Sequence, residues 1–223
     1  MKLVVFDLDG TLTDSAEGIK NSIKSALESG DLPIPTNDIL NLFIGPPIVD
    51  SFKEHCHMDD TEAHIYYQAF RKRYVSIGKF ENKVYQDIPY VLSTLRKKNY
   101  ILAVATAKPE EQAREILEHF QLASYFHVIK GANYNTGIIR KDGILHAALE
   151  ASYQLLPSNC NYTVQYMVGD RMYDMHAAKE YDCKGIGVLY GYGTLEELKK
   201  ANATYLCDTP LDVLDVILKN DYT

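Results

Sequence analysis

The chain has 223 residues, of which 46% are hydrophobic and 24% are charged, and its net charge is −7 at pH 7. This composition is that of a globular protein and excludes a fibrous or disordered chain. The excess of acid argues against a nucleic-acid partner, because phosphate backbones are bound through excess Lys and Arg, and no apolar run approaches the ~20 residues that cross a membrane.

Residues 3–7, Leu3-Val4-Val5-Phe6-Asp7, form a short apolar run that ends in an acid. We expect a fully buried strand here, whose terminal carboxylate lies at the sheet edge where open α/β sheets hold their ligands. Asp9 follows two residues later, and Gly10 then lets the chain turn sharply. Two carboxylates at this spacing can share a cation, or divide into a nucleophile and a proton donor. The alternative is an ordinary acidic turn after a strand.

The stretch from residue 15 to residue 85 shows helical periodicity and no good strand. One crossover helix needs far fewer residues, so we expect an inserted helical domain. The predicted organisation is a catalytic core of residues 1–14 and 86–223 and a helical cap of residues 15–85. A small domain hinged beside a catalytic edge acts as a lid, and the alternative is a helical decoration with no gating role.

Four further segments are predicted to be buried strands because each is short and rich in Val, Ile or Ala: residues 101–106, 127–131, 164–169 and 185–189. Helices are expected after Pro109, over residues 142–155, and after Thr209-Pro210, where Thr is a cap and Pro a first-turn residue. Alternating strands and helices predict a doubly wound, Rossmann-like parallel sheet with right-handed crossovers.

Polar side chains follow three of the five predicted strands. The first of these strands ends in Asp7. Thr106 and Lys108 end the second strand, where a hydroxyl and an ammonium suit a bound phosphate; a helix cap and a solvated lysine are the alternative. Asp170 ends the fourth strand, and Asp174 follows at i+4, on the same side if the turn is helical. These two acids could serve one metal ion, one by binding it and the other by supporting the acid that binds it. The alternative is an Asp that caps the helix.

Between the third and fourth strands, Arg140 and Lys141 open a predicted helix. A cation is mildly unfavourable at a helix N-terminus, so one of the two is a candidate functional residue. The position in the chain does not choose between them, and a solvated surface cation is the alternative.

Three buried strands that each end in a group needed for phosphoryl transfer, in this order, resemble the haloacid dehalogenase superfamily. The resemblance is strongest to its phosphoglycolate-phosphatase-like members with a helical cap, and it covers essentially the whole chain. It includes the cap pieces Ile44-Gly45-Pro46-Pro47 and Arg71-Lys72-Arg73-Tyr74, and the run from Gly187 to Gly193.

The resemblance implies roles for particular residues. Asp7 corresponds to the nucleophile, Asp9 to the general acid and base, and Thr106 to the hydroxyl that binds the phosphoryl group. Lys141, rather than Arg140, corresponds to the lysine that steadies nucleophile and phosphate. The implied magnesium site consists of Asp7, Asp9 through its backbone carbonyl, Asp170 and the supporting Asp174. The implied substrate contacts are Gly10, Thr11, Thr106, Ala107, Lys108 and Lys141 in the core, and Gly45, Pro46 and Arg71 in the cap. Ala107 departs from the relatives, which often carry Asn or Ser there.

The sequence therefore predicts a Mg²⁺-dependent phosphatase that hydrolyses small phosphomonoesters through an aspartyl phosphate, with a small phosphorylated metabolite as its partner. A 5′-nucleotidase or a pyrophosphatase on the same scaffold is the alternative among enzymes. The alternative from another class is a catalytically idle phosphate- or partner-binding module, and the presence of both Asp7 and Asp9 argues against it. No signal-type apolar segment precedes Asp7 and the four cysteines are widely spread, so a cytoplasmic location is expected.

Overall fold

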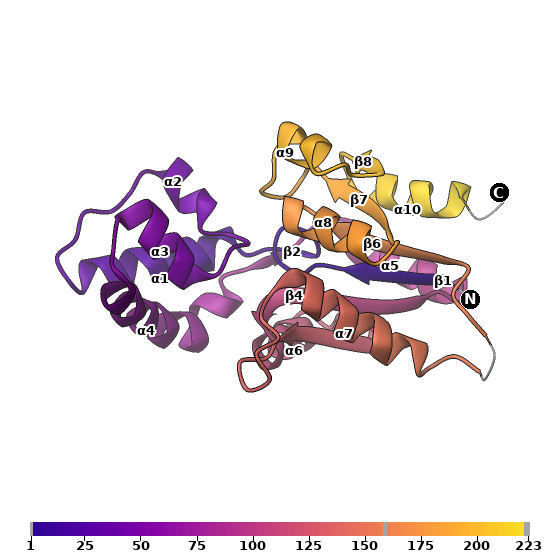
Figure 1. Cartoon of the computed structure of the whole chain (residues 1–223), viewed down its shortest axis with the longest axis horizontal. Helices are drawn as coiled ribbons and strands as arrows, with labels where there is room; N and C mark the ends of the chain where they lie inside the picture. The colour runs from indigo at the N-terminus through magenta and orange to yellow at the C-terminus, as the bar shows by residue number, and fades with distance from the viewer. Residues whose placement is uncertain (1, 158–159, 221–223) are drawn as a thin grey trace. The chain divides into compact units, whose positions relative to one another are not determined.

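The computed structural model describes residues 2–157 and 160–220 (Figure 1). The chain divides into two compact units, one made of Met1–Thr13 and Val84–Thr223 and the other of Asp14–Lys83. The boundaries predicted from the sequence lie one residue later at the first junction and two residues later at the second. The first unit is a sheet covered by helices, and the second is helical.

The sheet of the first unit has six parallel strands in the order β5-β4-β1-β6-β7-β8. The strands are β1 (Lys2–Phe6), β4 (Ile101–Pro109), β5 (Val128–Ala132), β6 (Val164–Gly169), β7 (Lys184–Val188) and β8 (Tyr205–Cys207). The predicted doubly wound parallel sheet is confirmed. The sequence prediction missed β8, because a three-residue edge strand is too short to show any periodicity.

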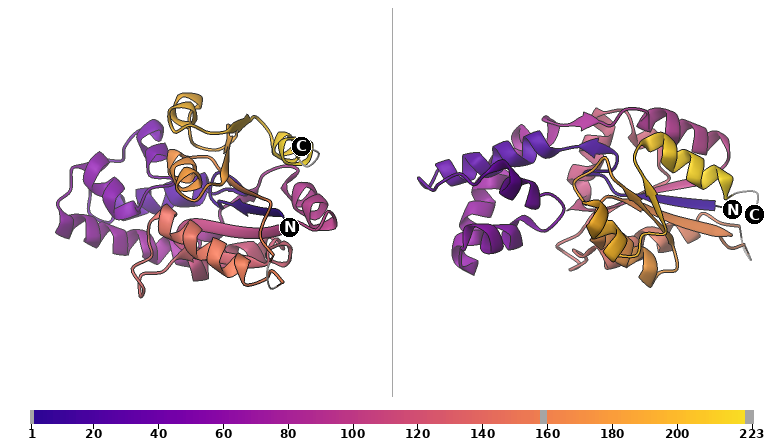
Figure 2. Two further views of the ribbon diagram at one scale, coloured as in Figure 1. Left: turned by 45° about the vertical axis from the view of Figure 1, so that its right-hand side comes forward. Right: turned by 90° about the horizontal axis from the view of Figure 1, so that it is seen from above.

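Helices cover both faces of the sheet, as the two views of Figure 2 show. On one face, Leu3 and Val5 of β1 pack with α7 (Lys141–Tyr153) and α8 (Met172–Glu180). On the other face, Val4 and Phe6 pack with α5 (Ile88–Lys97), α6 (Glu110–His119) and α10 (Pro210–Lys219). Because alternate residues of a strand point to opposite faces, a strand buried on both sides is a continuous apolar run, which is the pattern of residues 3–6. The short helix α9 (Leu195–Lys200) packs its Leu198 with Met175 of α8.

Two predicted helix starts can be compared with the structure. Thr209 caps α10, where its hydroxyl accepts a hydrogen bond from the backbone N–H of Asp212 and Pro210 occupies the first turn. By contrast, Thr106 does not cap the next helix, since α6 begins at Glu110 after Pro109. The helix-cap interpretation of Thr106 is therefore wrong, which leaves its hydroxyl for another role.

The second unit contains α1 (Ala16–Glu28), α2 (Asn37–Leu42), α3 (Ile48–Cys56), α4 (Asp60–Ser76) and the 3₁₀ turn η1 (Gly78–Phe80). Its buried residues include Ile23, Leu27, Leu40, Phe43 and Phe52. The capping box of Asp59 and Glu62 fixes the start of α4. The strands β2 (Thr13–Asp14) and β3 (Lys83–Val84), which contain the unit boundaries, form a two-stranded sheet. The predicted all-helical insertion is thus confirmed.

Among the described residues, no helix combines the length and the apolar character that crossing a membrane requires.

Candidate active site

The strand register gathers the predicted polar groups at one edge of the sheet. Phe6 of β1 pairs with Val104 of β4 and Val168 of β6, so the residues that follow these three positions lie toward the same carboxyl edge of the sheet. Asp7 continues the ladder by donating its backbone N–H to the carbonyl of Val168 at 2.9 Å. Asp170 follows the last residue of β6, and Thr106 lies in the carboxyl-terminal half of β4. This edge is where open parallel sheets bind ligands.

Lys141 reaches this edge from the first turn of α7. Its Nζ lies 2.8 Å from Oδ1 of Asp7 and 2.8 Å from Oδ1 of Asp174, and it donates to the carbonyl oxygen of Ala105 at 3.0 Å. The Arg140 side chain is 87% exposed, and its Nε lies 3.7 Å from Oδ1 of Asp142. The structure thus places Lys141, and not Arg140, among the carboxylates.

Three carboxylates cluster around this lysine. Asp7, Asp170 and Asp174 are buried, and one oxygen from each lies within 4.8 Å of the others. Burial raises the pKa of Asp7 to about 6, with Asp174 adding to the rise and Lys141 opposing it. Burial, together with the charges of Asp174 and Asp7, also raises the pKa of Asp170. The cluster therefore holds more negative charge than its surroundings compensate.

The same charges act on Lys141 in the opposite direction. Burial alone would lower its pKa, but the carboxylates of Asp174 and Asp7 outweigh burial, and the pKa is raised. Lys141 therefore stays an ammonium through the physiological range. One ammonium does not neutralise three buried carboxylates, so the cluster can attract a hard cation. An all-oxygen donor set of this kind suits Mg²⁺.

Two glycine-containing turns hold Asp170 in place. Tyr192 donates its backbone N–H to Oδ2 of Asp170 at 2.8 Å, and the Thr11 hydroxyl donates to Oδ1 at 3.5 Å. Gly10 has a φ of +81°, and a Cβ there would lie 2.2 Å from Oδ2 of Asp170; a Cβ on Gly191 would lie 2.4 Å from Cβ of Asp170. Only glycine allows these turns to approach the carboxylate so closely.

The Gly191-Tyr192 turn contacts a carboxylate of the cluster, and no such contact was predicted from the sequence. Its sequence signal was the Gly-x-Gly pattern after β7, which is no dinucleotide fingerprint because Glu196 stands where the third glycine of that motif is needed. In the structure this turn donates a backbone hydrogen bond to a carboxylate of the cluster.

Asp9 is not one of the three clustered carboxylates, and its side chain contacts a different lysine. Its Oδ2 lies 3.1 Å from Nζ of Lys108, and both side chains are largely buried. Its Oδ1 is buried and has no hydrogen-bond partner among the described residues. The Thr106 hydroxyl accepts a hydrogen bond from the backbone N–H of Lys108 at 3.3 Å. Lys108 was expected to contact the substrate phosphate. In the structure it contacts Asp9, the expected general acid and base.

The remaining predicted substrate residues fall into two groups. Gly10 and Thr11 are buried in the loop after β1, and Ala107 is half-buried in β4. Gly45, with a φ of +108°, and Pro46 lie in the loop between α2 and α3 of the other unit. Arg71 is exposed on α4 of that unit. The substrate roles of these residues stay predictions.

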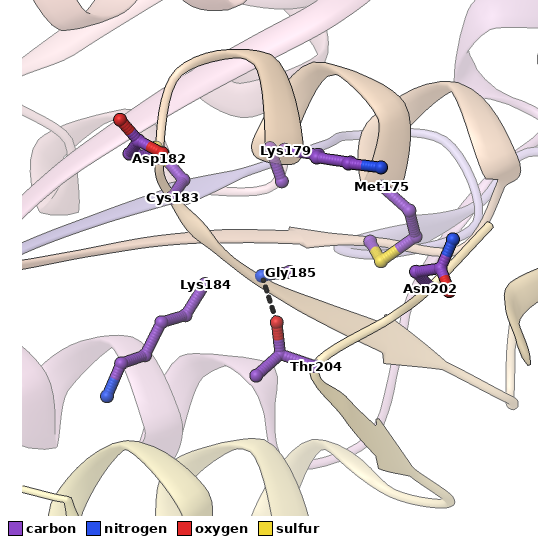
Figure 3. Close-up of a pocket in the computed structure, with 9 residues that line it drawn as sticks. Met175, Lys179, Asp182, Cys183, Lys184, Gly185, Asn202 and Thr204 are labelled. Atoms are coloured by element: carbon purple, nitrogen blue, oxygen red, sulfur yellow. Dashed lines mark hydrogen bonds between the residues drawn. The ribbon is translucent and has the colours of Figure 1, made fainter.

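A separate cavity of about 260 Å³ lies at the amino end of β7, where Figure 3 shows its lining side chains. Met175 and Lys179 of α8 form one wall, and Asn202 and Thr204 form another. The Thr204 hydroxyl accepts a hydrogen bond from the backbone N–H of Gly185 at 3.2 Å. Because Asp170 follows the carboxyl end of the neighbouring strand, this cavity is not part of the carboxylate site.

Comparison of the chain with known proteins identifies its family. Residues 4–188 match the family described as haloacid dehalogenase-like hydrolase. A 5′-nucleotidase from Pseudomonas aeruginosa is 35% identical over 92% of this chain and 90% of that protein. The tyrosine-protein kinase PtkA of Mycobacterium tuberculosis is 36% identical over 91% of this chain and 67% of its own length. The crystal structure of a "predicted phosphatase" from Clostridium acetobutylicum has a TM-score of 0.88 at 39% identity and covers 98% of both chains.

A phosphoglycolate phosphatase from Aquifex aeolicus is also similar, with 29% identity over 86% of both chains. The chain therefore belongs to the haloacid dehalogenase-like hydrolase family. The family and the enzyme class predicted from the sequence, a phosphatase of this family, are confirmed. The names of the relatives differ in what those proteins act on.

Proposed function

We propose that this chain is a Mg²⁺-dependent phosphatase that hydrolyses small phosphomonoesters through an aspartyl-phosphate intermediate. The observation that carries the proposal is the position of Lys141, whose ammonium contacts both Asp7 and Asp174 beside the buried carboxylate of Asp170. This arrangement sets a nucleophile, a fixed positive charge and an oxygen-rich cation site at one sheet edge. These are the parts that phosphoryl transfer needs.

In the first step, a carboxylate oxygen of Asp7 attacks phosphorus and the ester P–O bond breaks. The bonding electron pair stays on the leaving oxygen, which takes a proton from the carboxyl group of Asp9. Lys141 orients Asp7 and offsets the repulsion between its carboxylate and the anionic ester. The products are the alcohol and an acyl phosphate on Asp7.

In the second step, water attacks the phosphorus of the acyl phosphate. The Asp9 carboxylate takes a proton from that water, and the bond between phosphorus and the Asp7 oxygen breaks. Inorganic phosphate leaves, Asp7 is again a carboxylate, and Asp9 is again protonated. Splitting the hydrolysis in this way replaces one difficult step by two easier ones.

The residues that would hold Mg²⁺ are Asp7 and Asp170 through their side chains and Asp9 through its backbone carbonyl, with Asp174 in support. When bound, the ion supplies positive charge that offsets the charge of the phosphoryl group. The fit rests on three buried carboxylates within reach of one ion, two of them with raised pKa values.

The proposed substrate is a small phosphorylated metabolite of the phosphoglycolate type. A 5′-nucleotidase activity is the second candidate, supported by the 35% identity to the Pseudomonas aeruginosa protein of that name. A cytoplasmic location belongs to the same proposal and is supported by the free thiols of all four cysteines.

The test is phosphate release with Mg²⁺ from p-nitrophenyl phosphate, phosphoglycolate, nucleoside 5′-monophosphates and pyrophosphate. We expect release from the aryl ester and a preference for one monoester. A preference for phosphoglycolate supports the first candidate, and one for nucleoside monophosphates supports the second. No release from any of these compounds would favour the idle binding module.

A further inference from the structure

Lys108 and Asp9 form a buried ion pair in which Nζ lies 3.1 Å from Oδ2, and the side chains are only 6% and 13% exposed. A buried ammonium loses its hydration, so a lysine is held in such a place by a partner that offsets the loss. The two site lysines therefore contact different acids. Lys141 contacts Asp7 and Asp174, whereas Lys108 contacts Asp9.

The backbone of β4 presents Lys108 to this carboxylate. The pairing of β4 with β5 shifts register between Thr106 and Pro109. The backbone N–H of Lys108 turns back to the Thr106 hydroxyl at 3.3 Å. Irregular strand ends of this kind re-aim side chains next to functional sites.

The two oxygens of Asp9 have different surroundings. Oδ2 contacts the ammonium of Lys108, while Oδ1 is buried with no hydrogen-bond partner among the described residues. A buried carboxylate oxygen without a partner is costly, and such a group points to a partner that arrives with a ligand. A carboxyl group that exchanges a proton with substrate needs this division, one oxygen anchored and the other available.

We propose that Lys108 is the positioning residue for proton transfer by Asp9, holding Oδ2 so that Oδ1 meets the leaving oxygen and later the attacking water. This proposal rests on the proposed function above. It differs from the role implied by the family resemblance, in which Lys108 contacts the substrate phosphate.

The leaving group separates these two roles. The p-nitrophenolate ion leaves without being protonated, whereas an alkoxide needs the proton of Asp9. A lysine that binds the phosphoryl group serves both esters equally, since both carry the same group. A lysine that positions Asp9 matters far more for the alkyl ester.

The experiment compares Lys108→Met with wild type on p-nitrophenyl phosphate and on the alkyl phosphate that wild type hydrolyses best. For the alkyl ester we expect kcat/KM to fall by ~100-fold, the lower range for loss of general acid catalysis. For the aryl ester, kcat/KM stays within about threefold, because it reports only steps up to nitrophenolate departure. The second step still needs Asp9 as a base, so a burst of one nitrophenolate per enzyme appears before a slow steady state.

Lys108→Arg keeps a cation and is expected to restore most of the alkyl-ester rate. Lys108→Gln, which keeps a hydrogen-bond donor without the charge, replaces the Met variant if that variant does not fold.

Equal losses for both esters in Lys108→Met, with no burst, would overturn the positioning role and return Lys108 to the phosphate. In that case the active wild type leaves the proposed function standing. If wild type releases phosphate from neither ester, the proposed function fails, and the role of Lys108 fails with it.

Discussion

Asp7 leaves β1 in contact with the Lys141 ammonium, and its own chemistry gives the most direct test of the site. Asp7→Asn should abolish turnover, because an amide oxygen cannot form the acyl phosphate. The change keeps the size of the side chain, so circular dichroism should show an intact fold. Steady-state phosphate release checks the prediction. A variant that retains even a tenth of the wild-type kcat would show that Asp7 is not the nucleophile.

The neighbouring cations Arg140 and Lys141 differ in position although they are adjacent in sequence. Lys141→Ala removes an ammonium at 2.8 Å from two carboxylates, and we expect kcat/KM to fall by ~100-fold or more, the scale of losing one preorganised charge. Arg140→Ala changes an exposed side chain and is the matched control, with an expected change below about twofold. Measuring kcat/KM of the two purified variants checks this prediction. A larger loss in Arg140→Ala than in Lys141→Ala would contradict the role of Lys141.

Prediction from sequence succeeded at residues whose place follows from strand ends. Asp7, Thr106 and Asp170 could be expected at one edge because parallel strands share their carboxyl end. The contact of Lys108 with Asp9 could not be predicted, because it depends on a local register shift in β4. The hydrogen bond from Tyr192 to Asp170 depends likewise on a turn conformation that no periodicity reveals.

At the scale of elements, strands and helices were predictable where burial repeats along the chain. The strands β1, β4, β5, β6 and β7 are buried on both sides and appear as apolar runs in the sequence. The edge strand β8 was not predictable, since three residues carry no pattern. The start of α10 was predictable, because the Thr209-Pro210 pair is a local signal for a helix start.

The turn after β7 is predicted to position Asp170 for its role in the site. Gly191→Ala places a Cβ 2.4 Å from both Cβ of Asp170 and the carbonyl oxygen of Gly10, so the turn must move away from the carboxylate. We expect kcat/KM to fall by at least ~10-fold, the order of loss when groups that orient metal ligands are displaced. Gly143→Ala in α7 is the control, because its Cβ meets Ile138 at an ordinary 3.5 Å and alanine favours a helix. Equal activity of both variants would show that the turn does not position Asp170.

For the whole molecule, the uncompensated carboxylates link stability to pH and to metal. The pKa of Asp7 is raised from 3.8 to about 6, so its protonated form is favoured in the fold. The stabilising contribution of this group is present below its unfolded pKa and is lost as the pH rises through about 6. The pKa of Asp170 is raised as well, so its contribution has the same sign. Metal-free protein therefore carries a destabilising term at neutral pH that a bound cation offsets.

Thermal unfolding with and without Mg²⁺ checks this linkage. We expect millimolar Mg²⁺ to raise Tm clearly at pH 7.5 and much less at pH 5, since protons compete for the same carboxylates. The pH 7.5 shift should disappear in Asp170→Asn, which removes a ligand charge and keeps the side-chain size. An equal Mg²⁺ shift at both pH values, or one that persists in the variant, would place the ion elsewhere.

The helical unit offers cations that could contact the part of a substrate that does not react, and such contacts can set specificity. Arg71 is exposed on α4 and has no ion pair among the described residues, whereas Arg73 makes two bonds to Glu81, at 2.7 and 2.8 Å. If the unit acts as a cap, Arg71→Ala should raise KM for phosphoglycolate by ~10-fold or more, about the loss of one charge-assisted contact. Its KM for p-nitrophenyl phosphate, which lacks the carboxylate, should change little. Arg73→Ala should instead lower Tm by roughly 2–4 °C and leave the ratio of the two KM values unchanged. If Arg71→Ala changes both substrates equally, Arg71 is a solvated residue on the surface of α4, and recognition of the substrate carboxylate comes from other residues.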